Sequence, residues 1–172
     1  MINYDLTKIK ALVFDVDGVL SSSTISVDTN GEFLRTTNVK DGYALHLAVN
    51  QGLHVAIITG GGEESIALRY GRIGIEDIFM SSSVKTEKLQ QLLDKYNLSR
   101  DEVLYMGDDI PDYEVMKQVG LPCCPRDAAP EIRNISLYIS HIDGGKGCVR
   151  DVTEQVLKAQ KKWMSDEKAF TW

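Results

Sequence analysis

The sequence contains few of the residues that mark disulfide-rich, nucleic-acid-binding or membrane-spanning proteins. Its three cysteines form an odd set without metal-ligand spacing, which favours reduced structural thiols in a cytosolic protein. Acidic residues outnumber basic ones by 25 to 19, and the net charge of -6 at pH 7 argues against a nucleic-acid partner. No apolar run approaches membrane-spanning length, and the charged segment 1–10 lacks the apolar core of a signal peptide. We therefore expect a cytoplasmic protein with neither a nucleic-acid nor a membrane partner.

Neither an internal repeat nor a low-complexity tract divides the chain of 172 residues. Hydrophobic residues make up 43% of it and charged residues 26%, which is an ordinary balance for a globular protein with a sizeable core. We expect a single domain over residues 1–172, ending in a loose tail with an aromatic end at about 164–172.

Short apolar runs alternate with helical patterns along most of the chain. This alternation predicts an α/β fold: a Rossmann-like doubly wound parallel sheet with helices on both faces. The runs that predict strands are 9–14, 53–58, 78–80, 103–106, 121–124 and 135–139, and the patterns that predict helices are 43–50, 63–72, 85–96, 111–119, 128–134 and 149–163.

Residues 24–37 interrupt this alternation soon after the first strand. Two β-prone segments flank Asn30-Gly31, and this pair is a strong signal for a tight hairpin turn. The hairpin is either an ordinary surface ribbon or, given its place in the chain, a flap over a site or an assembly surface. Two short strands are marginally stable alone, so we expect this flap, at about 20–38, to pack against another part of the assembly.

The first predicted strand ends in two carboxylates, Asp15 and Asp17, which Gly18 follows. Ligands of open α/β sheets bind at the carboxyl ends of the strands, where these two acids lie. Because Gly18 turns the chain, we expect one acid to point at a bound phosphorus atom and the other to aim past it. Taken alone, the pair is also compatible with a solvated strand end.

Two further segments carry groups that suit an anion. Thr59, Gly60 and Gly61 join a strand to a helix, and a hydroxyl, exposed N–H groups and a helix amino terminus favour phosphate binding, although a plain turn has the same residues. Lys85 lies in the first turn of a predicted helix, where a cation opposes the helix dipole, which indicates a functional role. Lys88, one turn further on, is the alternative lysine.

The strand predicted at 103–106 is followed by Asp108, Asp109 and Asp112. Three carboxylates within five positions repel one another unless protonation or a metal ion relieves them. The cluster therefore favours a cation at this edge of the sheet. For Asp109 and Asp112 three roles stay open: hydrogen bonding to metal-bound water, orienting Lys85, and capping the helix at Pro111.

In order along the chain, these groups match the four motifs of the haloacid dehalogenase superfamily of phosphohydrolases, which residues 9–112 resemble. More narrowly, nearly the whole chain resembles the 3-deoxy-D-manno-octulosonate 8-phosphate phosphatase family. The stretches that carry this closer resemblance are 14–20, 38–43, 57–60, 107–109 and Gly144-Gly145-Lys146-Gly147.

The resemblance implies Mg²⁺-dependent hydrolysis of that sugar phosphate through an aspartyl-phosphate, in lipopolysaccharide sugar biosynthesis. It implies that Asp15 is the nucleophile, that Asp17 is the general acid, and that Thr59 and Lys85 hold the phosphoryl oxygens. The implied magnesium ligands are Asp15, the backbone carbonyl of Asp17, and Asp108.

Residues that contact the sugar acid must supply the selectivity. Arg69 suits a carboxylate because its guanidinium can donate two parallel hydrogen bonds. His46 stands where several relatives have arginine, and Gly61 stands where they have a longer side chain, so a phosphatase for a nine-carbon ulosonate 9-phosphate is the alternative. The substrate contacts that the resemblance implies are Asp17, Asn38, Val39, Lys40, Asp41, Gly42, His46, Thr59, Gly60, Gly61, Arg69 and Lys85.

The segments after the first and second motifs are too short to hold a cap domain. Relatives of this type are homotetramers in which hairpins and adjacent subunits close the pocket, and the resemblance implies the same assembly here. A phospho-receiver signalling domain is a different class to consider, but it would place its metal-binding acids as an adjacent pair and would be shorter. The presence of every motif residue argues against a third class, a catalytically inactive assembly module.

Overall fold

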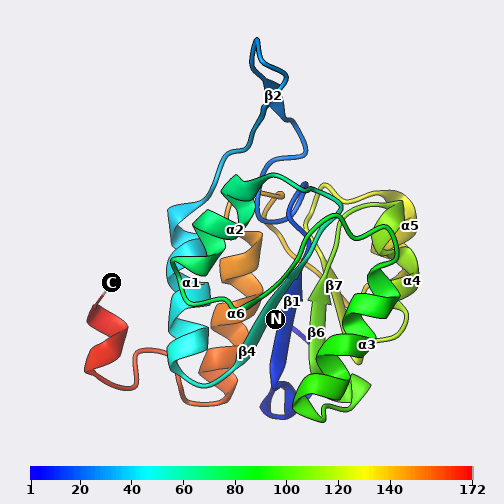
Figure 1. Ribbon diagram of the computed structural model, residues 1–172. Helices are drawn as coiled ribbons and strands as arrows, with labels where there is room; N and C mark the ends of the chain where they lie inside the picture. Colours follow the sequence, from blue (N-terminus) through cyan, green and yellow to red (C-terminus); the bar gives the residue numbers. More distant parts are fainter. Residues whose placement is uncertain (172) are drawn as a thin grey trace.

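The computed structural model describes residues 1–171, apart from the side chain of Lys168, and these residues form a six-stranded sheet with helices on both faces (Figure 1). The strands are all parallel, in the order β5-β4-β1-β6-β7-β8, which confirms the predicted doubly wound fold. They are β1 (Ala11–Phe14), β4 (His54–Ile58), β5 (Asp77–Phe79), β6 (Val103–Met106), β7 (Leu121–Cys124) and β8 (Tyr138–Ile139).

The two faces of the sheet pack against different sets of helices, because neighbouring strand residues point to opposite sides. Leu12 and Phe14 of β1 face one core, and Ala11 and Val13 face the other. The first core is covered by α1 (Val39–Asn50), α2 (Glu64–Gly71) and α6 (Cys148–Ala159), and the second by α3 (Lys85–Tyr96), α4 (Tyr113–Met116) and α5 (Pro130–Ile135).

Local hydrogen bonding explains two differences from the predicted helix boundaries. Helix α1 begins four residues earlier than predicted because the Asn38 side chain accepts hydrogen bonds from the N–H groups of Lys40 and Asp41. Helix α6 ends at Ala159 rather than at residue 163. Lys161 adopts a left-handed conformation there, and the N–H of Lys162 bonds back to an earlier carbonyl, so the helix cannot continue.

Two predicted elements in the second half of the chain are shorter than expected. The helix predicted at 111–119 is a 3₁₀ turn, η3 (Ile110–Asp112), followed by the single turn of α4. The N–H groups of Gln118 and Val119 then bond carbonyls three residues back, so the chain continues in turns rather than in an α-helix. The strand predicted at 135–139 is reduced to β8 because α5 continues through Ile135.

A β-hairpin formed by β2 (Ser26–Val27) and β3 (Phe33–Leu34) projects beyond the sheet (Figure 1). Gly31 has a φ of +83° at its tip, and the Asp28 carboxylate accepts hydrogen bonds from two N–H groups of the turn. The predicted hairpin is thus confirmed. Its strands are exposed on both faces, unlike those of the main sheet.

The segment after α6 contacts the first core. A 3₁₀ turn, η4 (Glu167–Phe170), places Ala169 in the first core, and the Tyr43 hydroxyl donates a hydrogen bond to the Ala169 carbonyl. The predicted tail thus contacts the fold at Ala169, whereas Met164 and Phe170 are exposed, and its aromatic end, Trp172, lies outside the described residues. Among residues 1–171, no helix is long and apolar enough to cross a membrane.

Candidate active site

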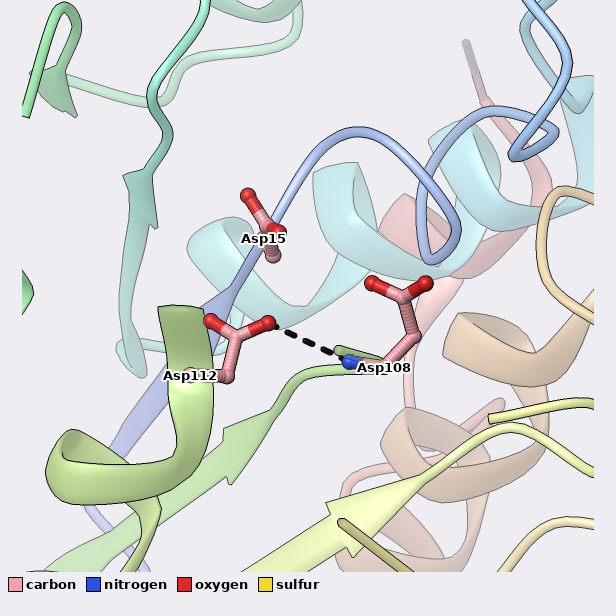
Figure 2. A group of neighbouring side chains, drawn as sticks. All are labelled: Asp15, Asp108 and Asp112. Carbon is pink, nitrogen blue, oxygen red and sulfur yellow. Dashed lines mark hydrogen bonds between the residues drawn. The ribbon is translucent and has the colours of Figure 1, made fainter. Parts of the chain in front are cut away.

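Three carboxylates from two distant segments of the sequence meet at the carboxyl edge of the sheet. Asp15 follows β1, Asp108 follows β6 after Gly107, and Asp112 closes η3. Figure 2 shows the three side chains around a common space, and each offers an oxygen that lies within 4.8 Å of those of the other two. The parallel order of β1 and β6 brings these residues together, because neighbouring parallel strands end at the same edge.

Lys85 is the lysine that reaches these acids. Its Nζ lies 2.9 Å from Asp15 Oδ2 and 2.8 Å from Asp112 Oδ1, and the residue is only 6% exposed. Burial alone would lower the pKa of Lys85, but the carboxylates of Asp15 and Asp112 outweigh it and raise that pKa. Lys85 is therefore held as a buried cation beside Asp15.

Asp112 accepts three hydrogen bonds and is fully buried. Lys85 Nζ and the Tyr105 hydroxyl each lie 2.8 Å from its Oδ1, and the Asp108 N–H lies 3.2 Å from its Oδ2 (Figure 2). Of the three roles left open by the sequence, Asp112 thus has the one that orients Lys85. Asp109 instead is exposed at the start of η3.

The charges around this space fit a divalent cation. Three carboxylates and one ammonium leave two negative charges in a largely buried site. Burial, and then the neighbouring Asp15 and Asp112, raise the pKa of Asp108 to about 8, and burial with Asp112 raises the pKa of Asp15 despite its ion pair with Lys85. Asp108 Oδ1 is also buried without a hydrogen-bond partner among the described residues. Oxygen ligands and excess negative charge of this kind suit Mg²⁺.

The loop after Asp15 packs directly against the Asp108 carboxylate. Gly18 has a φ of +82°, and a Cβ atom built on it would lie 1.9 Å from Asp108 Oδ2. Only glycine satisfies both the left-handed backbone and this close approach. The loop then turns back, with the Ser21 N–H bonded to the Val16 carbonyl.

Thr59 lies at the same edge, directly after β4. It is 1% exposed, and its Oγ1 accepts a hydrogen bond of 3.1 Å from the Gly61 N–H, which shapes the turn toward α2. Gly60, between them, is exposed. The structure therefore places this predicted phosphate-binding turn beside β1, the strand that carries Asp15.

Asp17 lies near the three carboxylates, but its side chain pairs with other residues. It lines a hollow of about 230 Å³ together with Asp15, Asp108 and Asp109. Its carboxylate pairs with Arg35, a residue at the base of the hairpin that sequence reasoning missed. No local signal distinguishes Arg35 from an ordinary surface arginine, because its two acidic partners are 18 and 28 positions away.

Three of the residues expected to contact the sugar have partners within this chain. Asn38 caps α1, and Asp41 Oδ1 accepts a 2.6 Å hydrogen bond from the Arg150 N–H in the first turn of α6. The His46 ring lies within hydrogen-bonding distance of the Ile73 carbonyl and the Asn50 side chain. Val39 and Lys40 are exposed at the start of α1, and Gly42 is buried within it.

Arg69 lines a larger cavity next to the acidic hollow. This cavity has a volume of about 490 Å³ and lies between the hairpin and α2, with Arg35, Thr36, Glu63 and Tyr70 also in its wall. Arg69 Nε is buried and lacks a hydrogen-bond partner among the described residues.

Comparison with known proteins agrees with this geometry. The family model for haloacid dehalogenase-like hydrolases matches residues 64–144. The chain is 40% identical over 154 residues to the 3-deoxy-D-manno-octulosonate 8-phosphate phosphatase of Salmonella typhi, which covers 90% of this chain and 82% of that protein.

Two solved structures extend the similarity to three dimensions. The 3-deoxy-D-manno-octulosonate 8-phosphate phosphatase of Yersinia pestis superimposes with a TM-score of 0.89 at 36% identity, covering 92% of this chain and 85% of that one. The enzyme of that name from Moraxella catarrhalis, in complex with a magnesium ion, a phosphate ion and a KDO molecule, gives a TM-score of 0.91 at 30% identity, covering 97% and 96%. With this sequence identity over most of its length, the chain belongs to the 3-deoxy-D-manno-octulosonate 8-phosphate phosphatase family of haloacid dehalogenase-like hydrolases.

Proposed function

We propose that this chain hydrolyses 3-deoxy-D-manno-octulosonate 8-phosphate to the free sugar acid and phosphate, as a step of lipopolysaccharide sugar biosynthesis. The observation that carries the proposal is the meeting of Asp15, Lys85 and Asp108 at adjacent strand ends, in a chain 40% identical to an enzyme of that name. We also place the reaction in the cytoplasm, in keeping with three cysteines that are buried free thiols.

Asp15 is the proposed nucleophile. Phosphate monoesters require accelerations of up to ~10²¹-fold, so the reaction is divided into two steps through an aspartyl-phosphate. Asp15 attacks phosphorus while Asp17 gives a proton to the departing alkoxide, and Asp17 then takes a proton from the water that cleaves the acyl phosphate. The ammonium of Lys85, 2.9 Å from Asp15 Oδ2, stabilises the charge on the transferring phosphoryl oxygens, and the Thr59 hydroxyl donates to the same group.

The proposed magnesium ligands are the carboxylates of Asp15 and Asp108 and the backbone carbonyl of Asp17. Magnesium held there supplies positive charge that lets a carboxylate approach a phosphate dianion. Asp112 holds Lys85 beside Asp15, and Asp108 is fixed by its own N–H bond to Asp112. Asp109, exposed at the edge of the hollow, is left to bond with water.

The sugar acid is proposed to occupy the 490 Å³ cavity, whose size suits a small ligand. Arg69 lines this cavity and donates to the carboxylate there, and its buried Nε has no partner among the described residues. A nine-carbon ulosonate 9-phosphate has the same two anionic ends, so chain length is the property that separates the two candidate substrates.

A homotetramer is proposed as the working form, with a neighbouring subunit completing the site. Val27 and Leu34 of the hairpin are 59% and 57% exposed, and Phe33 is 42% exposed, which is unusual for an isolated two-stranded ribbon. The proposal predicts that Leu34→Glu shifts the mass measured by light scattering from four copies to fewer. An unchanged mass, or a monomeric wild type, would reject it.

The function is tested by phosphate release from the eight-carbon and nine-carbon sugar phosphates, with Mg²⁺ and after chelation. We expect higher kcat/KM for the eight-carbon substrate, no turnover after chelation, and none in Asp15→Asn, which keeps the side-chain volume. A preference for the nine-carbon substrate would replace the substrate assignment, and turnover by Asp15→Asn would remove the nucleophile assignment.

A further inference from the structure

Arg35 joins the hairpin to the residue proposed as general acid. Its Nε lies 2.7 Å from Asp17 Oδ1 and its terminal nitrogen 3.0 Å from Asp17 Oδ2, so both carboxylate oxygens accept from one guanidinium. The third nitrogen lies 2.6 Å from Glu63 Oε2, in the residue that precedes α2. The Arg35 side chain is 8% exposed, although it belongs to an otherwise exposed segment.

The absence of a side chain at position 61 allows this arrangement. A Cβ atom built on Gly61 would lie 3.0 Å from the terminal nitrogen of Arg35 and 3.2 Å from Glu63 Oε2. A larger residue would push the guanidinium away from α2. The ion pair of Arg35 with Glu63 therefore packs directly against Gly61, in the turn that follows Thr59.

This pairing occupies the oxygens that Asp17 needs for the proposed reaction. Besides its two bonds with Arg35, Asp17 Oδ1 accepts a 3.0 Å hydrogen bond from the Ser21 hydroxyl. Oδ1 then accepts two hydrogen bonds and Oδ2 one, so turning the carboxylate toward a leaving group or an attacking water requires breaking its bonds with Arg35. Arg35 lines the cavity proposed for the sugar acid, while Asp17 lines the acidic hollow, so their ion pair lies between the two halves of the site.

We propose that Arg35 is a positioning residue that holds Asp17 aside in the empty site and exchanges it for the carboxylate of the sugar acid. The proposal rests on the proposed function for its substrate. Arg35 and Arg69 line the same cavity, so the carboxylate that Arg69 contacts can also offer Arg35 the two-oxygen partner that Asp17 provides. The guanidinium of Arg35 then loses no hydrogen bond in the exchange. Asp17 is then free to turn toward the phosphoryl group, and a phosphate ester without a carboxylate leaves it held.

The test compares kcat/KM for the eight-carbon sugar phosphate and for p-nitrophenyl phosphate, which has no carboxylate. Arg35→Gln should lower the value for the sugar phosphate about a hundredfold, because a buried charged contact is lost. The same variant should raise the value for p-nitrophenyl phosphate about fivefold, because Asp17 is no longer held. A merely structural role cannot move the two substrates in opposite directions.

Two further variants keep the test decisive. Arg100→Gln is the matched control. Its guanidinium, in the turn before β6, bonds Gln90 and Gln118, and neither substrate should change. Arg35→Lys keeps the charge but not the two-point contact, so it should show both changes at smaller size. It provides the test if Arg35→Gln fails to fold.

Equal losses on both substrates in the Arg35 variants, or no change on either, would overturn the proposal. A wild type that releases no phosphate from the sugar phosphate rejects the proposed function instead. In that case p-nitrophenyl phosphate alone decides on Arg35: a gain in Arg35→Gln supports the release of Asp17, and the absence of a gain overturns it.

Discussion

Replacing Asp112 with asparagine tests whether this residue organises the site. The variant keeps the side-chain shape but exchanges an acceptor oxygen for an amide donor. With Oδ1 kept toward Lys85 and Tyr105, the Asp108 N–H faces the new NH₂ group and loses its acceptor, which costs about 1–3 kcal/mol. Rotating the amide moves the same conflict onto Lys85 and Tyr105.

The bond to Lys85 also weakens, since a neutral amide accepts less strongly than a carboxylate by about 1 kcal/mol. Together these effects predict that Asp112→Asn lowers the free energy of unfolding by about 2–4 kcal/mol. The measurement is urea unfolding in saturating Mg²⁺, where relief of repulsion among the carboxylates does not oppose the loss. Because Lys85 then keeps only its ion pair with Asp15, kcat/KM should fall about 10²-fold.

Asp109→Asn is the control for this prediction. It makes the same chemical change three positions away at an exposed residue, so unfolding should change by less than about 0.5 kcal/mol. If the two variants unfold at the same urea concentration and retain the same activity, Asp112 does not hold Lys85 and Asp108 as described.

Four other outcomes are expected. Asp17→Asn should lose turnover but keep Mg²⁺ binding in calorimetry, because only its backbone carbonyl is a proposed ligand; lost binding would contradict the division of roles. Asp108→Ala should raise the Mg²⁺ concentration needed for activity far more than Asp109→Ala, and equal Mg²⁺ curves would show a misassigned ligand. Arg69→Ala should lose ~2–4 kcal/mol in kcat/KM on the sugar phosphate and almost nothing on p-nitrophenyl phosphate, whereas a uniform loss would place Arg69 elsewhere. Burial raises the pKa of Asp41 from 3.8 to about 6 despite its bond from the Arg150 N–H, so its stabilisation is complete below pH 4 and is lost as the pH rises through 6. Asp41→Asn should remove about 3 kcal/mol of this pH dependence of unfolding between pH 4 and 7, and a slope equal to that of the wild type would refute it.

Much of the fold and the main chemical groups of the site follow from the sequence because they depend on local patterns. The apolar run before Asp15 specifies a buried strand, and Asn30-Gly31 specifies a tight turn. Since parallel strands end at one edge, the acids after two such runs are expected together, and Asp15 and Asp108 do meet there. The segment 85–96 is found as a helix with the predicted boundaries.

Only the tertiary structure decided which side chains pair across long separations in the sequence. Asp112 binds Lys85, 27 positions away, and this contact selects one of three roles that the local sequence permits equally. Arg35 gains its importance only because the base of the hairpin passes beside Asp17. Asp41 in α1 accepts a hydrogen bond from the first turn of α6, 109 positions away. Each outcome depends on which buried polar group lacks a partner after the chain has packed, and no short window of sequence contains that information.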